Sequence, residues 1–245
     1  MTKQDIADAL ADKARELAFE NQLAAADVPH INALASTLAG RFPATATPPA
    51  PPAPAQPPSA DLLTLRSACE LVDHEAIVLE WYLDSVKVGT WGIGVTNKSG
   101  HNVDRYKDSP QTIEHVLDIY VWLLRNNYIP AVVKAFAGHT LTEAQFTAAL
   151  SFHYNTGAIL DTTWVALWRD GKPKAARAFL TSHYLNGGDL QDRRDAEAAL
   201  FFDGVWSTEN GTAVVWPVKK PSYTPDWAHP QRVDIRNDMT KALAA

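Results

Sequence analysis

The sequence has little of what several common classes of protein require. The 245 residues include one cysteine, Cys69, so no intrachain disulfide can form and a thiolate zinc site would lack ligands. Cys69 lies in a mostly apolar segment, which favours packing over reactivity. No window approaches the roughly 18 apolar residues of a membrane span. The 22 basic residues are outnumbered by 28 acidic ones, giving a net charge of −6. We therefore expect no nucleic-acid partner and no stable membrane insertion.

The N-terminus also lacks the apolar core of a secretory signal peptide. Its first 19 residues, MTKQDIADALADKARELAF, carry a charge every few positions. If the protein acts outside the cytoplasm, we expect a separate component to release it.

Proline divides the chain into parts. Residues 43–60 hold half of the prolines and predict an extended polyproline-II linker, roughly 55 Å long at about 3.1 Å per residue. Residues 1–42 before it predict a small head of two helices. The head either docks on the body or self-associates as a helical hairpin, which we favour, or anchors the protein to a cell wall. Residues 61–212 predict the main domain, and residues 213–245 an extended tail with a short helix.

Helical patterns dominate the main domain. One helix leads up to Glu75, and another follows Ser109-Pro110, a cap with proline in the first turn. Thr142 and Gln145 form the sequence pattern of a capping box. Further helices are expected over residues 161–169, 172–184 and 190–202. Residues 86–96 combine β-favouring residues with glycines and predict a short β-ribbon. The fold class is thus α+β, mostly helical, with one small sheet near its start.

Chemistry concentrates in HEAIVLEWYLDSVKVGTWGIGVT, residues 74–96. It begins like a metalloprotease helix, but that motif needs a second histidine four residues after the first, and Val78 stands there. We therefore predict no metal and no cofactor. Glu75 and Asp84 offer a second interpretation, since glycoside hydrolases use two carboxyl groups in different surroundings. Taken alone, two acidic residues at this spacing are more often solvated surface charges.

A family resemblance favours the second interpretation. Glu75, eight residues, Asp84, five residues, Thr90 and then TWGIGVT resemble the active-site signature of phage-type lysozymes, glycoside hydrolase family 24. Tyr82 fits the same signature. Residues 146–158, FTAALSFHYNTGA, resemble the family's central helix and the polar loop beside its sugar cleft. LQDRRDAEAALFFDGVW, residues 190–206, resembles its arginine-rich C-terminal helix. The resemblance covers roughly residues 66 to 206.

The resemblance implies a lysozyme-like fold and a muramidase. Glu75 would be the general acid, Asp84 would orient or deprotonate the attacking water, and Thr90 would help to hold that water. The implied reaction is inverting hydrolysis of the β-1,4 bond between N-acetylmuramic acid and N-acetylglucosamine in the glycan strands of peptidoglycan.

Two further residues have an ordinary alternative to their implied role. Arg193 lies where the family pairs an arginine with the catalytic glutamate, but it also stands four residues before Glu197, the spacing of a helix ion pair. Asn155 would hydrogen-bond an N-acetyl sugar, or it caps a helix. Aromatic residues of the tail, Trp216, Tyr223 and Trp227, stack on sugars or, as we favour, pack on the body.

The sequence departs from the family pattern at three positions. Ala76 follows the glutamate in place of glycine, and Val95 replaces a histidine. Lys87 stands where the turn between the aspartate and the threonine carries glycine, with Gly89 two residues on, so we expect the hairpin to turn differently. Lys87 either places a cation near Asp84 or points outward.

We predict a phage endolysin that lyses the host cell. It would remain in the host cytoplasm until a separate holin releases it to the periplasm and cell wall; a virion-associated, wall-piercing enzyme fits equally. One rival is a lytic transglycosylase, which needs no aspartate to position water, so the spacing of Asp84 and Thr90 argues against it. The other is a catalytically impaired, lysozyme-derived wall-binding or virion structural protein, which Lys87 and Gly89 would favour.

Overall fold

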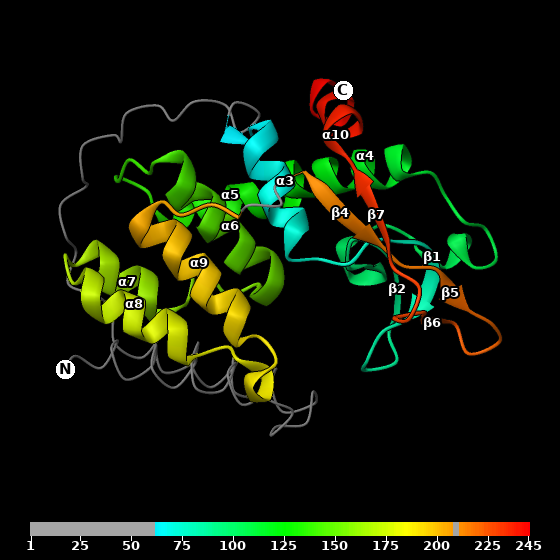
Figure 1. The fold of residues 1–245 in the computed structure, drawn as a ribbon. Helices are drawn as coiled ribbons and strands as arrows, with labels where there is room; N and C mark the ends of the chain where they lie inside the picture. Colours follow the sequence, from blue (N-terminus) through cyan, green and yellow to red (C-terminus); the bar gives the residue numbers. More distant parts are fainter. Residues whose placement is uncertain (1–61, 208–210) are drawn as a thin grey trace, which may run out of the picture.

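The computed structural model describes residues 62–207 and 211–245, so the predicted head and linker lie outside the described residues. Figure 1 shows the helices α5 to α9 gathered at one end of the molecule and the strands at the other, with α3 between them. We call these ends the helical lobe and the sheet lobe. The predicted fold class, α+β and mostly helical with a small antiparallel sheet, is confirmed. None of the described helices is long and apolar enough to cross a membrane.

The elements follow one another along the chain as α3 (Leu65–Asp73), β1 (Val78–Leu83), β2 (Gly89–Gly92), β3 (Val95–Thr96), η2 (Asn97–Ser99), η3 (Asp104–Tyr106), α4 (Ile113–Leu123), η4 (Leu124–Tyr128), α5 (Ile129–Ala135), α6 (Glu143–Thr156), α7 (Thr163–Arg169), α8 (Pro173–Ser182), η5 (Asn186–Gly188), α9 (Gln191–Asp203), β4 (Thr212–Val215), β5 (Val218–Lys219), β6 (Thr224–Pro225), β7 (Gln231–Asp234) and α10 (Arg236–Ala244).

Local capping explains where the helices begin. The capping box of Thr142 and Gln145 starts α6 as predicted, with both of its hydrogen bonds formed. A helix follows Ser109-Pro110 as predicted, but the predicted cap is wrong: α4 begins at Ile113, and Thr112 is its N-cap. The backbone N–H of Gln111 donates to the carbonyl of Leu79 on β1 (2.7 Å), which keeps the chain extended until Thr112.

The first sheet has the order β1-β2-β3, all antiparallel. Its second and third strands lie within the predicted β-ribbon, but its first strand begins earlier, at Val78, in a segment that the sequence interpretation left without a strand. VLEWYL is rich in the aliphatic and aromatic residues that strands favour. In the observed register Tyr82 lies opposite Thr90, so the aromatic ring and the hydroxyl face each other across neighbouring strands.

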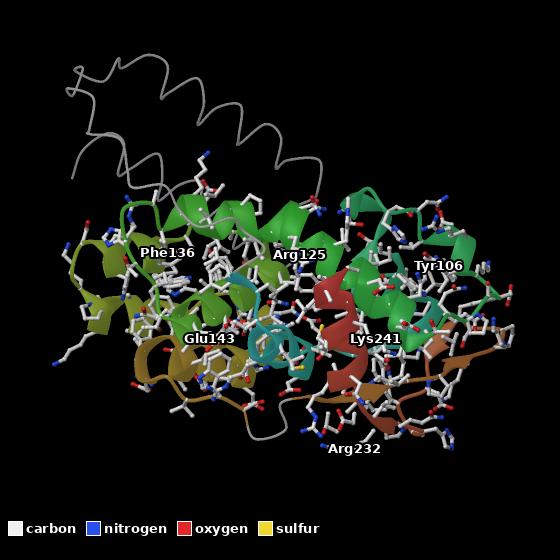
Figure 2. All side chains as sticks on the ribbon, turned by 90° about the horizontal axis from the view of Figure 1, so that it is seen from above. Tyr106, Arg125, Phe136, Glu143, Arg232 and Lys241 are labelled. Carbon is white, nitrogen blue, oxygen red and sulfur yellow. The ribbon has the colours of Figure 1, made fainter. Side chains whose placement is uncertain are left out.

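The C-terminal segment, residues 211–245, is folded onto β1 of the sheet lobe and onto the helices α3 and α4. Its strand β4 pairs with β7, and β5 pairs with β6. It also forms two backbone hydrogen bonds with Ile77, in the segment that follows Glu75. Ile77 N–H donates to the carbonyl of Val214 (3.1 Å), and Trp216 N–H donates to the carbonyl of Ile77 (2.8 Å). The helix α10 packs against α3 and α4. Figure 2 shows α10, which carries Lys241, lying over the middle of the molecule between the two ends.

A single hydrophobic core joins these elements. Its largest fully buried side chains include Trp91 from the sheet lobe and Trp164 from the helical lobe. Met239 of α10 belongs to the same core. Cys69 is fully buried, and burial raises the pKa of its thiol to about 11, so it packs as the sequence predicted.

Candidate active site

Glu75 stands at the junction of the two lobes. The helix α3 ends at Asp73, His74 is its C-cap, and Glu75 N–H still donates to the carbonyl of Val72 (2.9 Å). The next residues enter the sheet through Ile77 and Val78. This change from helix to strand leaves the side chain of Glu75 between the lobes, 18% exposed.

One carboxylate oxygen of Glu75 is held by Arg193. Arg193 Nη1 donates to Glu75 Oε1 (2.5 Å), while Arg193 Nε donates to Glu197 Oε1 (3.1 Å). The two alternatives weighed for Arg193 therefore hold at once. Its remaining nitrogen, Nη2, donates to the carbonyl of Ser151 (3.2 Å). Burial alone would lower the pKa of Arg193, but the charges of both glutamates outweigh it and the net shift is upward.

A second buried ion pair supports the first. Arg194 Nη1 lies 3.0 Å from Glu197 Oε2, and neither side chain is more than 1% exposed. Ser151 Oγ donates to Glu197 Oε1 (2.8 Å). The two arginines and the two glutamates, Glu75 and Glu197, form a buried network of balanced charge. The sequence interpretation missed Arg194 and Ser151, although the i, i+3 spacing from Arg194 to Glu197 on α9 was a signal for the pair.

Asn155 belongs to this network. It lies in the last turn of α6, which Gly157 ends with a left-handed backbone conformation (φ 69°), so it is helical. Its Oδ1 accepts a hydrogen bond from Arg194 Nη2 (2.6 Å). Within residues 62–207 and 211–245 its amide NH₂ makes no hydrogen bond, which leaves two donors for another molecule.

The other oxygen of Glu75, Oε2, faces the turn between β2 and β3. A Cβ atom added to Gly94 would lie 3.9 Å from Oε2, and the bare backbone of Gly94 leaves that space open. Gly94 is exposed and has a positive φ of 66°. Glu75 thus has one anchored oxygen and one oxygen beside an open glycine turn.

Asp84 and Thr90 lie together at the turn between β1 and β2. Asp84 Oδ1 accepts hydrogen bonds from the backbone N–H groups of Val86 (3.0 Å) and Val88 (2.8 Å). Thr90 Oγ1 lies 3.4 Å from Asp84 Oδ2 and 3.1 Å from the carbonyl of Val88, either of which can accept its proton. The turn backbone therefore fixes the carboxylate, and the threonine hydroxyl lies beside it.

Lys87 is exposed and, in the described part of the chain, forms no ion pair with Asp84. Its φ of 64° is the left-handed conformation that glycine favours, so a lysine occupies a glycine-type turn position. Gly89 is required for another reason: a Cβ atom there would lie 2.6 Å from Trp81 Nε1. With Lys87 in the turn and Gly89 after it, Asp84 and Thr90 still lie next to each other.

Tyr82 connects Glu75 with the Asp84 turn. Burial raises the pKa of its hydroxyl, and the charges of Glu75 and Asp84 each raise it further. Both carboxylates therefore act on one tyrosine. Among the described residues, no three or more histidine, cysteine, aspartate or glutamate side chains are grouped to hold a metal ion.

The chain is similar in sequence and in fold to known proteins. The family model described as phage lysozyme matches residues 72–197. An endolysin from Escherichia coli O157:H7 phage FAHEc1 matches with a TM-score of 0.51 and 23% identity, over 60% of this chain and 98% of that one. At this identity the similarity shows the fold.

Two further structures match with TM-scores below 0.5. A mutant of P22 lysozyme has a TM-score of 0.43 and 22% identity, over 55% of this chain and 94% of that one. The muramidase domain of SpmX from Asticaccaulis excentricus has a TM-score of 0.42 and 25% identity, over 56% and 95%. No curated protein sequence matches the chain.

Proposed function

The chain belongs to the phage lysozyme family, a family of glycoside hydrolases that act on peptidoglycan, and we propose that it hydrolyses the β-1,4 bond between N-acetylmuramic acid and N-acetylglucosamine. The observation that carries this proposal is that the two carboxyl oxygens of Glu75 have different surroundings. Oε1 is anchored by Arg193, whereas Oε2 faces the open turn at Gly94.

Glu75 is the general acid of the proposed reaction. Cleavage needs a proton on the leaving glycosidic oxygen, and Oε2 is the oxygen that is free to carry and deliver it. Arg193 is a supporting residue, because its bonds to Glu75, Glu197 and the Ser151 carbonyl leave the guanidinium no freedom to move. The fixed guanidinium in turn fixes the direction of the carboxyl.

Asp84 and Thr90 act on the water. The turn N–H groups hold Asp84 Oδ1, so Oδ2 and the nearby Thr90 hydroxyl are the pair that can orient a water molecule and present negative charge to the oxocarbenium-like transition state. We propose direct attack by this water with inversion at the anomeric carbon. Inverting enzymes keep the two carboxyls roughly 6.5–9.5 Å apart to admit it.

Asn155 is the proposed contact to the substrate. Arg194 holds its carbonyl oxygen, so the amide keeps a fixed direction and offers its NH₂ group to an N-acetyl oxygen. In biological terms, we propose a phage enzyme that lyses the host. It waits in the host cytoplasm until a holin releases it to the periplasm, or it is carried in the virion.

Glu75→Gln tests the proposal. An amide cannot deliver a proton, so the variant should lose at least the roughly 10²–10⁴-fold that acid catalysis contributes. The measurement is clearing of permeabilised Gram-negative cells, together with the release of reducing ends from purified peptidoglycan. The matched control is Glu114→Gln, an exposed glutamate on α4, which should retain full activity.

The same assay decides between the rivals. Near wild-type hydrolysis by folded Glu75→Gln would rule out the assigned acid. Products ending in 1,6-anhydromuramic acid would identify a lytic transglycosylase. A wild type that sediments with peptidoglycan but releases no ends would be a binding protein.

A further inference from the structure

Four tyrosines surround Glu75. Burial raises the pKa of the hydroxyls of Tyr82, Tyr120, Tyr128 and Tyr154, and in each case the charge of Glu75 raises it further. The ring of Tyr154 lies 5.3 Å from that of Tyr120, edge to face, and 4.8 Å from that of Tyr128. The rings of Tyr120, Tyr128 and Tyr154 therefore form one cluster, close enough to Glu75 for its charge to act on their hydroxyls.

The cluster depends on an irregular helix. Between α4 and α5, the segment η4 (Leu124–Tyr128) is a π-helix. Pro130 follows it in the first turn of α5, and proline cannot donate the backbone hydrogen bond of a regular helix there. The wider turn ends at Tyr128, whose ring meets Tyr154 on α6.

The hydroxyls of Tyr154 and Tyr120 differ in what they contact. Tyr154 Oη donates a hydrogen bond to the carbonyl oxygen of Ile93. The buried hydroxyl of Tyr120 has no hydrogen-bond partner in the described part of the chain. Ile93 precedes Gly94 in the turn that faces Glu75 Oε2. The bond from Tyr154 therefore joins the helical lobe to the sheet lobe at the wall of the site.

We propose that Tyr154 is a positioning residue for the reaction: its hydroxyl holds the Ile93–Gly94 turn against the free oxygen of Glu75. This inference rests on the proposed function. Tyr154 itself need not touch the substrate. The turn that it holds limits how much water reaches Oε2 and fixes the space into which the glycosidic oxygen enters. In a variant without the hydroxyl, the Ile93 carbonyl accepts hydrogen bonds from water instead, and the turn moves away from Glu75.

The variant Tyr154→Phe, which keeps the ring, tests the inference. Misplacement at a reacting centre costs rate more than binding, so kcat on soluble peptidoglycan fragments should fall about tenfold with KM changed less than about twofold. Tyr120→Phe is the matched control, since it removes a hydroxyl that has no partner, and it should leave kcat and KM unchanged.

The outcomes separate this inference from the proposed function. An active wild type with an unchanged, folded Tyr154→Phe overturns the inference alone, and so do equal losses in both phenylalanine variants. An inactive wild type overturns both. If Tyr154→Phe does not fold, Gly94→Ala is used instead, because it changes the exposed residue of the same Ile93–Gly94 turn. It should show the same loss of kcat with KM retained, and an unchanged kcat would overturn the inference.

Discussion

Asp84 has a structural task and a chemical task that single substitutions can separate. Asp84→Asn keeps an oxygen that can accept from the N–H groups of Val86 and Val88, so the melting temperature should change little. It removes the negative charge, so hydrolysis should fall at least about 10²-fold. Thermal unfolding and reducing-end release measure the two effects. If Asp84→Asn unfolds at a much lower temperature, its loss of activity says nothing about charge and the separation of tasks is wrong.

Other substitutions at this turn show which property of each side chain the activity needs most. Asp84→Cys should retain measurable activity, because a thiolate restores the negative charge, whereas Asp84→Ala should not. Thr90→Ala removes one contact to the proposed water and should fall between them. Equal activity of the cysteine and alanine variants would contradict the need for a negative charge.

Glu197 is a residue of the site whose loss should cost considerable stability. Glu197→Gln leaves the buried guanidiniums of Arg193 and Arg194 with less than balancing charge, so the free energy of unfolding should fall by roughly 3 kcal/mol. Asp203→Asn breaks an exposed pair with Arg177, which solvent screens, and should cost far less. Denaturant unfolding checks both, and equal costs would show that the buried network is not what holds α9.

The sequence predicted part of the site for a clear reason. Glu75, Asp84 and Thr90 are close along the chain, so their spacing carries the signature. The contact between Arg193 and Glu75 came only from the resemblance, since α9 is far away in sequence. Tyr154 was missed because its role depends on the carbonyl of Ile93, and no pattern of side chains shows where a backbone carbonyl will lie.

Among the elements, the short helix α10 should contribute most, for its length, to the free energy of unfolding. Met239 is fully buried in the common core, and Ala242 lies beside it in the next turn. Met239→Ala should therefore lower the free energy of unfolding by roughly 2–5 kcal/mol. Lys241→Ala, on the exposed side of the same helix, is the control and should leave it nearly unchanged. A Met239→Ala protein as stable as the wild type would show that α10 is not part of the cooperative unit.

The strands of this C-terminal segment were beyond prediction. β5 and β6 have two residues each, too few to show an alternating pattern, and the segment is rich in proline. What makes them strands is tertiary contact. Tyr223 donates its hydroxyl to Asp108 and packs edge to face on Trp81, and its backbone carbonyl accepts from Leu83. Tyr223 thus packs on the body, as we favoured.

For the whole molecule, stability should fall as the solution becomes acidic. Burial lowers the pKa of His153 from 6.5 to about 4, and burial lowers the pKa of His74 and His101 as well. As the pH falls, these histidines are therefore protonated in the unfolded chain before they are protonated in the folded protein. The contribution of His153 is complete above about pH 6.5 and is lost on going down to pH 4, on the order of 3 kcal/mol.

Denaturant unfolding between pH 7.5 and 4 measures this loss. His153→Gln should flatten the decline, because glutamine does not titrate in this range. His139→Gln replaces a histidine that no described carboxylate pairs with and should follow the wild type. A decline of the same size in His153→Gln would assign the acid sensitivity to other groups.

The described lobes also predict what the rest of the chain contributes to catalysis. Glu75, Asp84, Thr90 and the arginines that support Glu75 all lie in residues 62–207. We expect a protein lacking residues 1–60 to unfold cooperatively and to hydrolyse purified peptidoglycan at the wild-type rate. Loss of cooperative unfolding in this fragment would show that the predicted head belongs to the same folding unit.

The hydrogen bonds that join Ile77 to Val214 and Trp216 also bear on how long the enzyme lasts once folded. They close a contact between residues far apart in the sequence, and the entropy cost of closing so long a loop disfavours its formation early in folding. Interactions that are absent from the transition state act on the rate of unfolding. The C-terminal segment would then act as a kinetic latch, one that leaves the speed of folding unchanged and lengthens the lifetime of the folded site around Glu75.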